Sequence, residues 1–187
     1  MSTAAPIAET SAFESACTPS VTLRNFFLDK LDRESVLIRM ALDRAPEGRN
    51  DFKPHPRSME LGYLASLVAG IPGWIPLMIE RDELNLDDPS SEGFRTKPLA
   101  TRAELQASLE AGVANARRAL TATNDQHLDT LWAFKMGGRT VQQNQRHIMI
   151  ADAVFSHLAH HRGQLTVYLR MLDSTVPALY GPSADEF

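Results

Sequence analysis

The sequence predicts an all-α protein, a four-helix bundle with a short hairpin before its last helix. Apolar residues recur at three- and four-residue spacing in four long segments, as they do on one face of an α-helix. Prolines, glycines and polar stretches separate these segments. A pair of glycines, Gly137 and Gly138, divides two short runs ahead of the last segment, as in a hairpin turn. Four amphipathic helices bury their apolar faces most simply against one another in a bundle.

The first predicted helix covers residues 21–44. Its apolar face is formed by Leu28, Leu31, Ser35, Ile38 and Leu42. The second helix is expected to begin near Ser58, a residue type that caps helix N-termini. Pro72 and Pro76 lie inside its apolar pattern, and each removes a backbone donor and clashes with the preceding turn. We therefore expect a kink or break near Gly73.

The third predicted helix opens with a capping box, in which Thr101 is followed three residues later by Glu104. The polar, turn-rich residues 81–98 precede it. A hairpin is predicted over residues 131–141, and because an isolated hairpin is only marginally stable it must pack against the helices. The last helix is expected to run from about residue 142 to 172. Its apolar side is formed by Ile150, Val154, Leu158, Leu165 and Leu169.

Length and composition indicate one globular domain. The chain has 187 residues, of which 43% are hydrophobic and 22% charged. Residues 1–20 are rich in Ala, Ser and Thr without periodicity and are predicted to be a disordered tail, which leaves 21–187 as the helical domain. The net charge of −4 argues against nucleic acid as a partner, because phosphate binding needs a surplus of Lys and Arg.

Other features of the sequence bear on the cellular location of the protein. Cys17 is the single cysteine, so no intramolecular disulfide can form, and we interpret it as an inert thiol. Residues 1–20 do not have the pattern of a secretory signal. No stretch is expected to provide the roughly 18 consecutive apolar residues of a membrane span. We therefore expect a cytoplasmic protein with no membrane partner.

The candidate chemistry lies in the last helix, where three of the six histidines cluster at positions 157, 160 and 161. Residues four apart share one face of a helix, so His157 and His161 can present two imidazoles to one metal ion. Gln164 lies on nearly the same stripe, and it either orients an imidazole or makes a polar contact across the bundle. Two histidines alone do not complete a metal site, and the other interpretation is a hydrogen-bonded polar layer.

The run HLAHHRGQL, from His157 to Leu165, resembles the C-terminal signature of the DinB-like (damage-inducible) family, which includes the YfiT-like proteins. Further blocks resemble the family in the same order along the chain. They are residues 53–56, 58–59, 61–62, 64–65, 72–74, 134–138 and 176–186. The resemblance thus covers most of residues 53–186, and it implies the fold of that family, a homodimer, and metal-dependent hydrolysis or thiol-dependent transfer.

The resemblance also implies where a metal ion would be held. In the family, one histidine on the second helix and two on the fourth hold the ion. The pair on the fourth helix maps onto His157 and His161, whereas the position on the second helix is occupied by Leu67, which cannot bind a metal. Ser66, Glu60, His55 and His147 are not expected to replace the missing ligand.

Two functions therefore remain open. One is a metal-dependent transferase or hydrolase that uses zinc or nickel at His157 and His161. The other is a metal-free family member that binds a small molecule or a protein as a homodimer, and Leu67 favours it. Trp74 and Trp132 are interpreted as packing anchors rather than a ligand cage. Gly163 is expected to allow another helix to approach closely.

Overall fold

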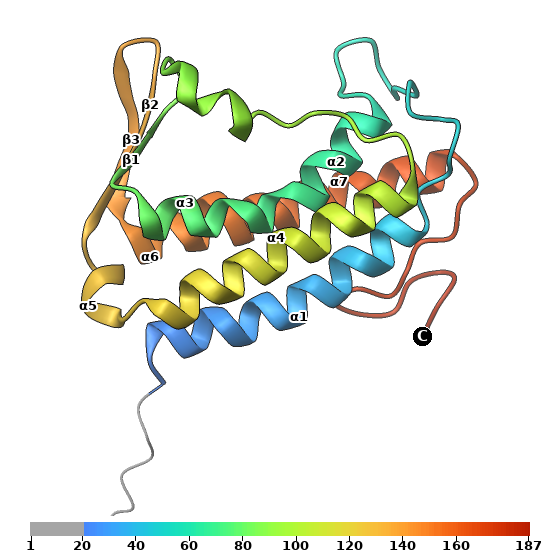
Figure 1. The fold of residues 1–187 in the computed structure, drawn as a ribbon. Helices are drawn as coiled ribbons and strands as arrows, with labels where there is room; N and C mark the ends of the chain where they lie inside the picture. The colour runs from blue at the N-terminus through green and yellow to red at the C-terminus, as the bar shows by residue number, and fades with distance from the viewer. Residues whose placement is uncertain (1–20) are drawn as a thin grey trace, which may run out of the picture.

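The computed structural model describes residues 21–187, apart from the side chains of residues 92 and 93 (Figure 1). The predicted tail, residues 1–20, and Cys17 lie outside the described residues. The first helix, α1, spans Leu23–Asp43, as the sequence predicts. The Thr22 hydroxyl accepts a hydrogen bond from the Asn25 amide at 3.2 Å and thereby caps its first turn. Its buried apolar face packs against α4 and α7.

The second helical segment is broken, as the two prolines predict. Helix α2 covers Leu61–Gly70, a 3₁₀ turn (η1) covers Ile71–Trp74, and α3 covers Ile75–Glu80. The predicted start at Ser58 is wrong, because Ser58 lies in a turn closed by the His55 carbonyl at 2.8 Å. The helix begins at Leu61 instead, where the Leu61 amide is held by the Phe52 carbonyl at 2.9 Å.

The α2–α3 segment is the most apolar part of the described chain. Residues Leu61–Glu80 are long and apolar enough to cross a membrane, with a mean hydropathy of 1.5, so the expectation that no stretch would qualify is wrong. However, 72% of that window is buried inside the fold. Its side chains contact α4 and α7, which is how the central helix of a folded domain is covered.

Helix α4 spans Arg102–Ala122 and begins with the predicted capping box of Thr101 and Glu104. It crosses η1 at a point where both chain segments have glycine. A Cβ added to Gly112 would lie 3.2 Å from the amide nitrogen of Gly73, closer than side chains ordinarily approach backbone. Gly163 was expected to have such a role, but a Cβ added there would have no neighbouring atom within 4 Å, so no other described helix of the same chain approaches it.

A small sheet makes the predicted all-α class too narrow. Strands β2 (Leu131–Met136) and β3 (Arg139–Gln145) form the predicted antiparallel hairpin, and both turn glycines have positive φ, 62° and 69°. A third strand, β1 (Glu83–Asn85), pairs in parallel with β2. It lies in the stretch expected to be irregular, and it is followed by a 3₁₀ turn, η2, over Pro89–Phe94. The chain is therefore mostly helical with a three-stranded sheet.

The last helix begins later than predicted. Residues 142–145 belong to β3, and helix starts at α6 (Arg146–Met149) after the four-residue helix α5 (Asp125–Leu128) and the hairpin. A π-helical stretch, η3, covers Ile150–Ser156, and α7 covers His157–Met171. Because π-helical hydrogen bonds join residues five apart, this stretch accommodates an extra residue per turn, and such stretches are frequent at functional sites.

The sheet lies at one end of the helices and the C-terminal segment runs along the other (Figure 1). The sheet packs near α3, α5 and α6, whereas the chain after α7 returns along α1. The core between these ends is formed by buried faces of α1, α2, α4 and α7. The cavity of the candidate site lies where the sheet meets the helices.

Candidate functional site

The two histidines singled out by their spacing do meet. The Nε2 atoms of His157 and His161 lie 2.6 Å apart, and their ring centroids are separated by 4.4 Å. Both side chains leave α7 on one face, as four-residue spacing requires. His161 is buried with 6% exposure, and His157 is half-buried beside the indole of Trp74, at 5.4 Å between ring centroids.

Gln164 sets the orientation of the pair. Its side-chain oxygen lies 2.8 Å from Nδ1 of His161, and since a carboxamide oxygen only accepts, Nδ1 of His161 carries the proton. The Nε2 atoms of the two rings are within hydrogen-bond distance of each other, and His157 makes a further hydrogen bond with the backbone of Ala153. Gln164 thus orients an imidazole, one of the two roles considered for it.

Both imidazoles favour the neutral form. Burial lowers the pKa of His157, and the neighbouring His161 lowers it further. Burial likewise lowers the pKa of His161, against the hydrogen bond with Gln164, which raises it. His160 is exposed, 4.9 Å from the His161 ring, and it adds to the depression of both values. A neutral pair can both accept and donate a proton near pH 7.

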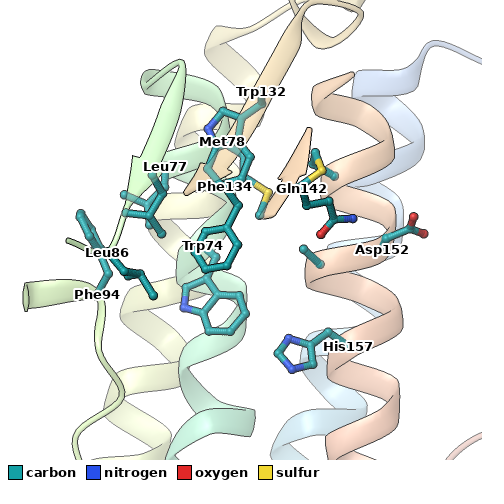
Figure 2. A pocket seen from close by; sticks show the side chains of 13 residues that line it. Trp74, Leu77, Met78, Leu86, Phe94, Trp132, Phe134, Gln142, Asp152 and His157 are labelled. Carbon is teal, nitrogen blue, oxygen red and sulfur yellow. The ribbon is translucent and has the colours of Figure 1, made fainter. Parts of the chain in front are cut away.

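The pair adjoins a cavity of about 500 Å³ whose walls are almost entirely apolar (Figure 2). His157 is the histidine that reaches it. The walls come mainly from α3, η1, η3 and the three-stranded sheet with the segment that follows β1. They include the apolar side chains of Trp74, Leu77, Met78, Leu84, Leu86, Phe94, Trp132, Phe134 and Met149. Trp132 belongs to the core and Trp74 packs against it, as expected of packing anchors, and both also line this cavity.

A carboxylate joins the segment after β1 to the turn of the hairpin. Asp87, just after β1, accepts hydrogen bonds from the amides of Gly138 at 2.8 Å and Gly137 at 3.1 Å. These two amides, that of Gly138 first, lower the pKa of Asp87 below its ordinary range. Both turn glycines have positive φ, a conformation that glycine adopts without steric cost. The contact joins the segment after β1 to the hairpin, and both β1 and the hairpin contribute side chains to the cavity wall.

The residues that the structure describes do not fit a resident metal ion. Zinc sites use three or four protein ligands, whereas no group of three His, Cys, Asp or Glu side chains converges within residues 21–187. Leu67 is 6% exposed in the apolar core of α2. The oxygen of Ser66 is already engaged, since it donates to the Gly62 carbonyl at 2.6 Å and accepts from the Leu99 amide at 2.8 Å.

The other candidate ligands are also used elsewhere. Nδ1 of His55 accepts from the Arg57 amide at 3.1 Å, and Glu60 pairs with Lys53 at 3.0 Å. Nδ1 of His147 lies 3.1 Å from the Leu128 carbonyl, at the end of the last helical segment that faces α5. None of these side chains lines the cavity.

Two arginines are buried in the fold. Arg162 is 1% exposed and pairs with Glu34 of α1 at 2.7 Å, and the Tyr180 hydroxyl donates to the same carboxylate at 2.9 Å. Pairing of Arg162 with a carboxylate is one of the roles that the sequence suggests for it, and the ion pair with Glu34 confirms it, in the interior and not at the surface. Arg146, 2% exposed, donates to the Met78 carbonyl at 2.7 Å at the end of α3. No local pattern could reveal them, because their partners lie far away in the sequence.

Comparison with known proteins agrees with this architecture. The model of the DinB family matches residues 61–187. A DinB-like protein of Bacillus subtilis, YjoA, superimposes with a TM-score of 0.63 at 15% identity, over 84% of this chain and 98% of that one. A DinB-like protein of Bacillus cereus also gives 0.63, at 22% identity, over 82% of this chain and 95% of that one.

Sequence similarity to a curated protein is confined to a short stretch. The uncharacterised protein YrdA of Bacillus subtilis is 47% identical over 34 residues, which are 18% of this chain. The chain thus matches about a fifth of the length of that relative, 20%. At these identities the two solved structures establish the fold alone.

Proposed function

This chain belongs to the DinB family, and from that premise we propose that it binds a small apolar molecule in the cavity beside His157, without a resident metal ion. The cavity itself carries the proposal. Its volume of about 500 Å³ lies within the range of sites for small organic ligands, and its walls are apolar and aromatic with few polar groups. A ligand there would be sequestered between the sheet and the helices.

The histidine pair supplies the polar end of this site. Both imidazoles are neutral near pH 7 because burial lowers the pKa of each. His157 lines the cavity, and His161 holds the ring of His157 through the contact of their Nε2 atoms at 2.6 Å. Gln164 fixes His161 in turn. The arrangement orients one imidazole toward the cavity and has no need of a metal ion to do so.

A neutral fluorescent probe tests the proposal. N-phenyl-1-naphthylamine, whose emission rises in apolar surroundings, should bind the parent protein saturably. Ala153 lines the cavity, so Ala153→Phe fills part of it and should weaken binding about tenfold or more, equivalent to ~1.4 kcal/mol. Ser156 is exposed on the same helical stretch, so Ser156→Phe is the matched control and should bind like the parent. Absence of saturable binding, or equal loss in both variants, would refute the proposal.

A second candidate is a transferase or hydrolase that uses a divalent ion, zinc or nickel, at His157 and His161. The observation that favours it is the convergence of the two Nε2 atoms, since two imidazoles four residues apart can share one ion. The described residues offer only these two ligands, so the remaining positions would have to be filled by water or by the substrate. Elemental analysis of the untagged protein beside His161→Ala tests it: near one equivalent of metal in the parent, lost in the variant, is the result expected of this candidate.

A further inference from the structure

The described residues inside the cavity offer a ligand no free polar group. Two of the inner lining side chains, those of His157 and Trp132, carry polar atoms. Nε2 of His157 is engaged by His161, and the ring makes a further hydrogen bond with the backbone of Ala153. Nε1 of Trp132 is fully buried within the protein, so a ligand does not reach it. Because a polar group buried without a hydrogen-bond partner loses its hydration, the part of a ligand inside the cavity must be apolar.

The cavity opens to solvent between β3 and η3, at a mouth formed by Gln142 and Asp152. Of the 13 described side chains that line the cavity, these two are the exposed ones, whereas the others are buried or half-buried. Figure 2 shows both on the side of the last helical segment, opposite Leu86 and Phe94, with the carboxylate of Asp152 pointing outward. A ligand whose apolar body fills the cavity would therefore have its hydrated end at this mouth.

The mouth has a negative charge that no described side chain neutralises. Every ion pair among the described residues involves side chains other than Asp152. Gln142 is neutral, and no lysine or arginine is among the described lining residues. Charges closer together than the Debye length, ~10 Å at 0.1 M salt, still interact through water. The mouth therefore attracts a cationic end of a ligand and repels an anionic one.

We infer that the cavity takes a cationic amphiphile, an apolar molecule with one protonated amine that stays hydrated at the mouth near Asp152. The inference rests on the proposed function, because it names the ligand class of the same cavity. The apolar body leaves water for the cavity, which drives binding. The ammonium remains at the rim in water, so binding does not require a charge to be buried.

Three probes with the same ten-carbon chain test this assignment. At about pH 7, decylamine is cationic, 1-decanol is neutral and decanoate is anionic. Displacement of bound N-phenyl-1-naphthylamine gives a Kd for each probe. At low salt, decylamine should bind the parent about threefold more tightly than decanol, and decanol about threefold more tightly than decanoate, because each step changes the charge near Asp152 by one. High salt should reduce both ratios, because it screens exposed charges.

Asp152→Asn removes the charge but keeps the shape of the side chain, so the three Kd values should converge. The matched control is Asp173→Asn, the same substitution at another exposed position, after the end of α7 and roughly 30 Å along the helix from Asp152. This control should keep the order of affinities of the parent.

The outcomes separate the ligand class from the binding function. If N-phenyl-1-naphthylamine binds the parent but the three probes bind equally or do not displace it, the assignment of a cationic amphiphile is wrong while the proposed binding function stands. The same conclusion follows if Asp152→Asn and Asp173→Asn change the three affinities alike. If N-phenyl-1-naphthylamine does not bind the parent saturably, both fail.

Discussion

At the scale of single residues, the neutral state of the imidazole pair links the stability of the fold to pH. Burial lowers the pKa of His157 and His161 from an ordinary value of 6.5, so the unfolded chain binds protons more readily than the folded one just below that value. The contribution that the neutral rings make to the free energy of unfolding is fully present above about pH 6.5. It is lost as the pH falls from there toward the lowered values of the folded state.

Acidification from about pH 7.5 to about pH 5.5 should therefore lower the free energy of unfolding of the parent. The decrease should be smaller in the double variant His157→Gln/His161→Gln, because it has no imidazole to protonate at these two positions. Urea denaturation at both pH values measures the difference. All other titratable groups are shared by the two chains, so the comparison isolates the pair. An equal loss in both chains would show that the two histidines are not held neutral by the fold.

Leu67 is the second residue with a measurable consequence. The family resemblance places a metal-binding histidine at this position, so Leu67→His should provide the third imidazole beside His157 and His161. We expect zinc affinity to rise about tenfold or more, that is by ~1.4 kcal/mol. Without metal the variant should be less stable than the parent, because Leu67 is 6% exposed and a buried imidazole loses its hydration.

Zinc should then raise the melting temperature of Leu67→His much more than that of the parent. The control is Leu67→His/His161→Ala, which has the new histidine but only one member of the pair, and it should not gain this response. If zinc stabilises the two Leu67→His chains equally, the three positions do not converge on one ion.

How far the site could be predicted differs from residue to residue. The meeting of His157 and His161 follows from their four-residue spacing, because both neighbours belong to one helix. The cavity could not be predicted in that way. It depends on Trp132 and Phe134 from the hairpin meeting Trp74 from η1, and a run of aromatic residues is equally typical of a packed core.

At the scale of secondary-structure elements, close packing of α4 on η1 depends on glycine. Gly112→Ala should destabilise the protein by about 1–3 kcal/mol, because its Cβ would lie 3.2 Å from the amide nitrogen of Gly73, and backbone atoms cannot move aside as a side chain can. Gly163→Ala should stabilise it by up to ~1 kcal/mol, because alanine favours a helix interior and no atom lies within 4 Å of the new methyl group.

Urea denaturation of the two variants measures both effects, and each serves as the control for the other. The same substitution is expected to act with opposite sign at the two positions. Destabilisation by Gly163→Ala would indicate that this face of α7 is covered in solution, for example by the second copy in the homodimer that the family resemblance implies.

Structural features that depend on residues close together in the chain were predicted from the sequence. The capping box of Thr101 and Glu104, the break around Pro72 and the turn at Gly137–Gly138 each depend on residues close together in the chain. The three-residue strand β1 was missed, since it is ordered by pairing with β2 and not by its own composition. The π-helical stretch was also missed, because an apolar residue at every fourth position suits both kinds of helix.

At the scale of the whole molecule, the segment after α7 is held against the helices by polar contacts. Glu34, Arg162 and Tyr180 form one buried cluster, and Arg44 pairs with Glu186 near the C-terminal end. Burial raises the pKa of Glu34, but the charge and hydrogen bond of Arg162 and the hydroxyl of Tyr180 outweigh burial and lower it. These contacts were not predicted, because Arg162 and Glu34 are 128 positions apart. The homodimer and the cytoplasmic location remain predictions.

The contact between Asp87, just after β1, and the hairpin also bears on the order in which parts of the protein fold. Asp87 and Gly137 are 50 positions apart, and α4 lies between them. Bringing such distant segments together costs loop entropy, whereas each helix forms through contacts within a few residues. The part of the cavity wall that β1 and the hairpin contribute is therefore expected to form late in folding. Refolding chains should regain their helical circular dichroism before they regain the fluorescence of bound N-phenyl-1-naphthylamine, and a newly made chain would be helical before the cavity that we propose to bind a ligand is complete.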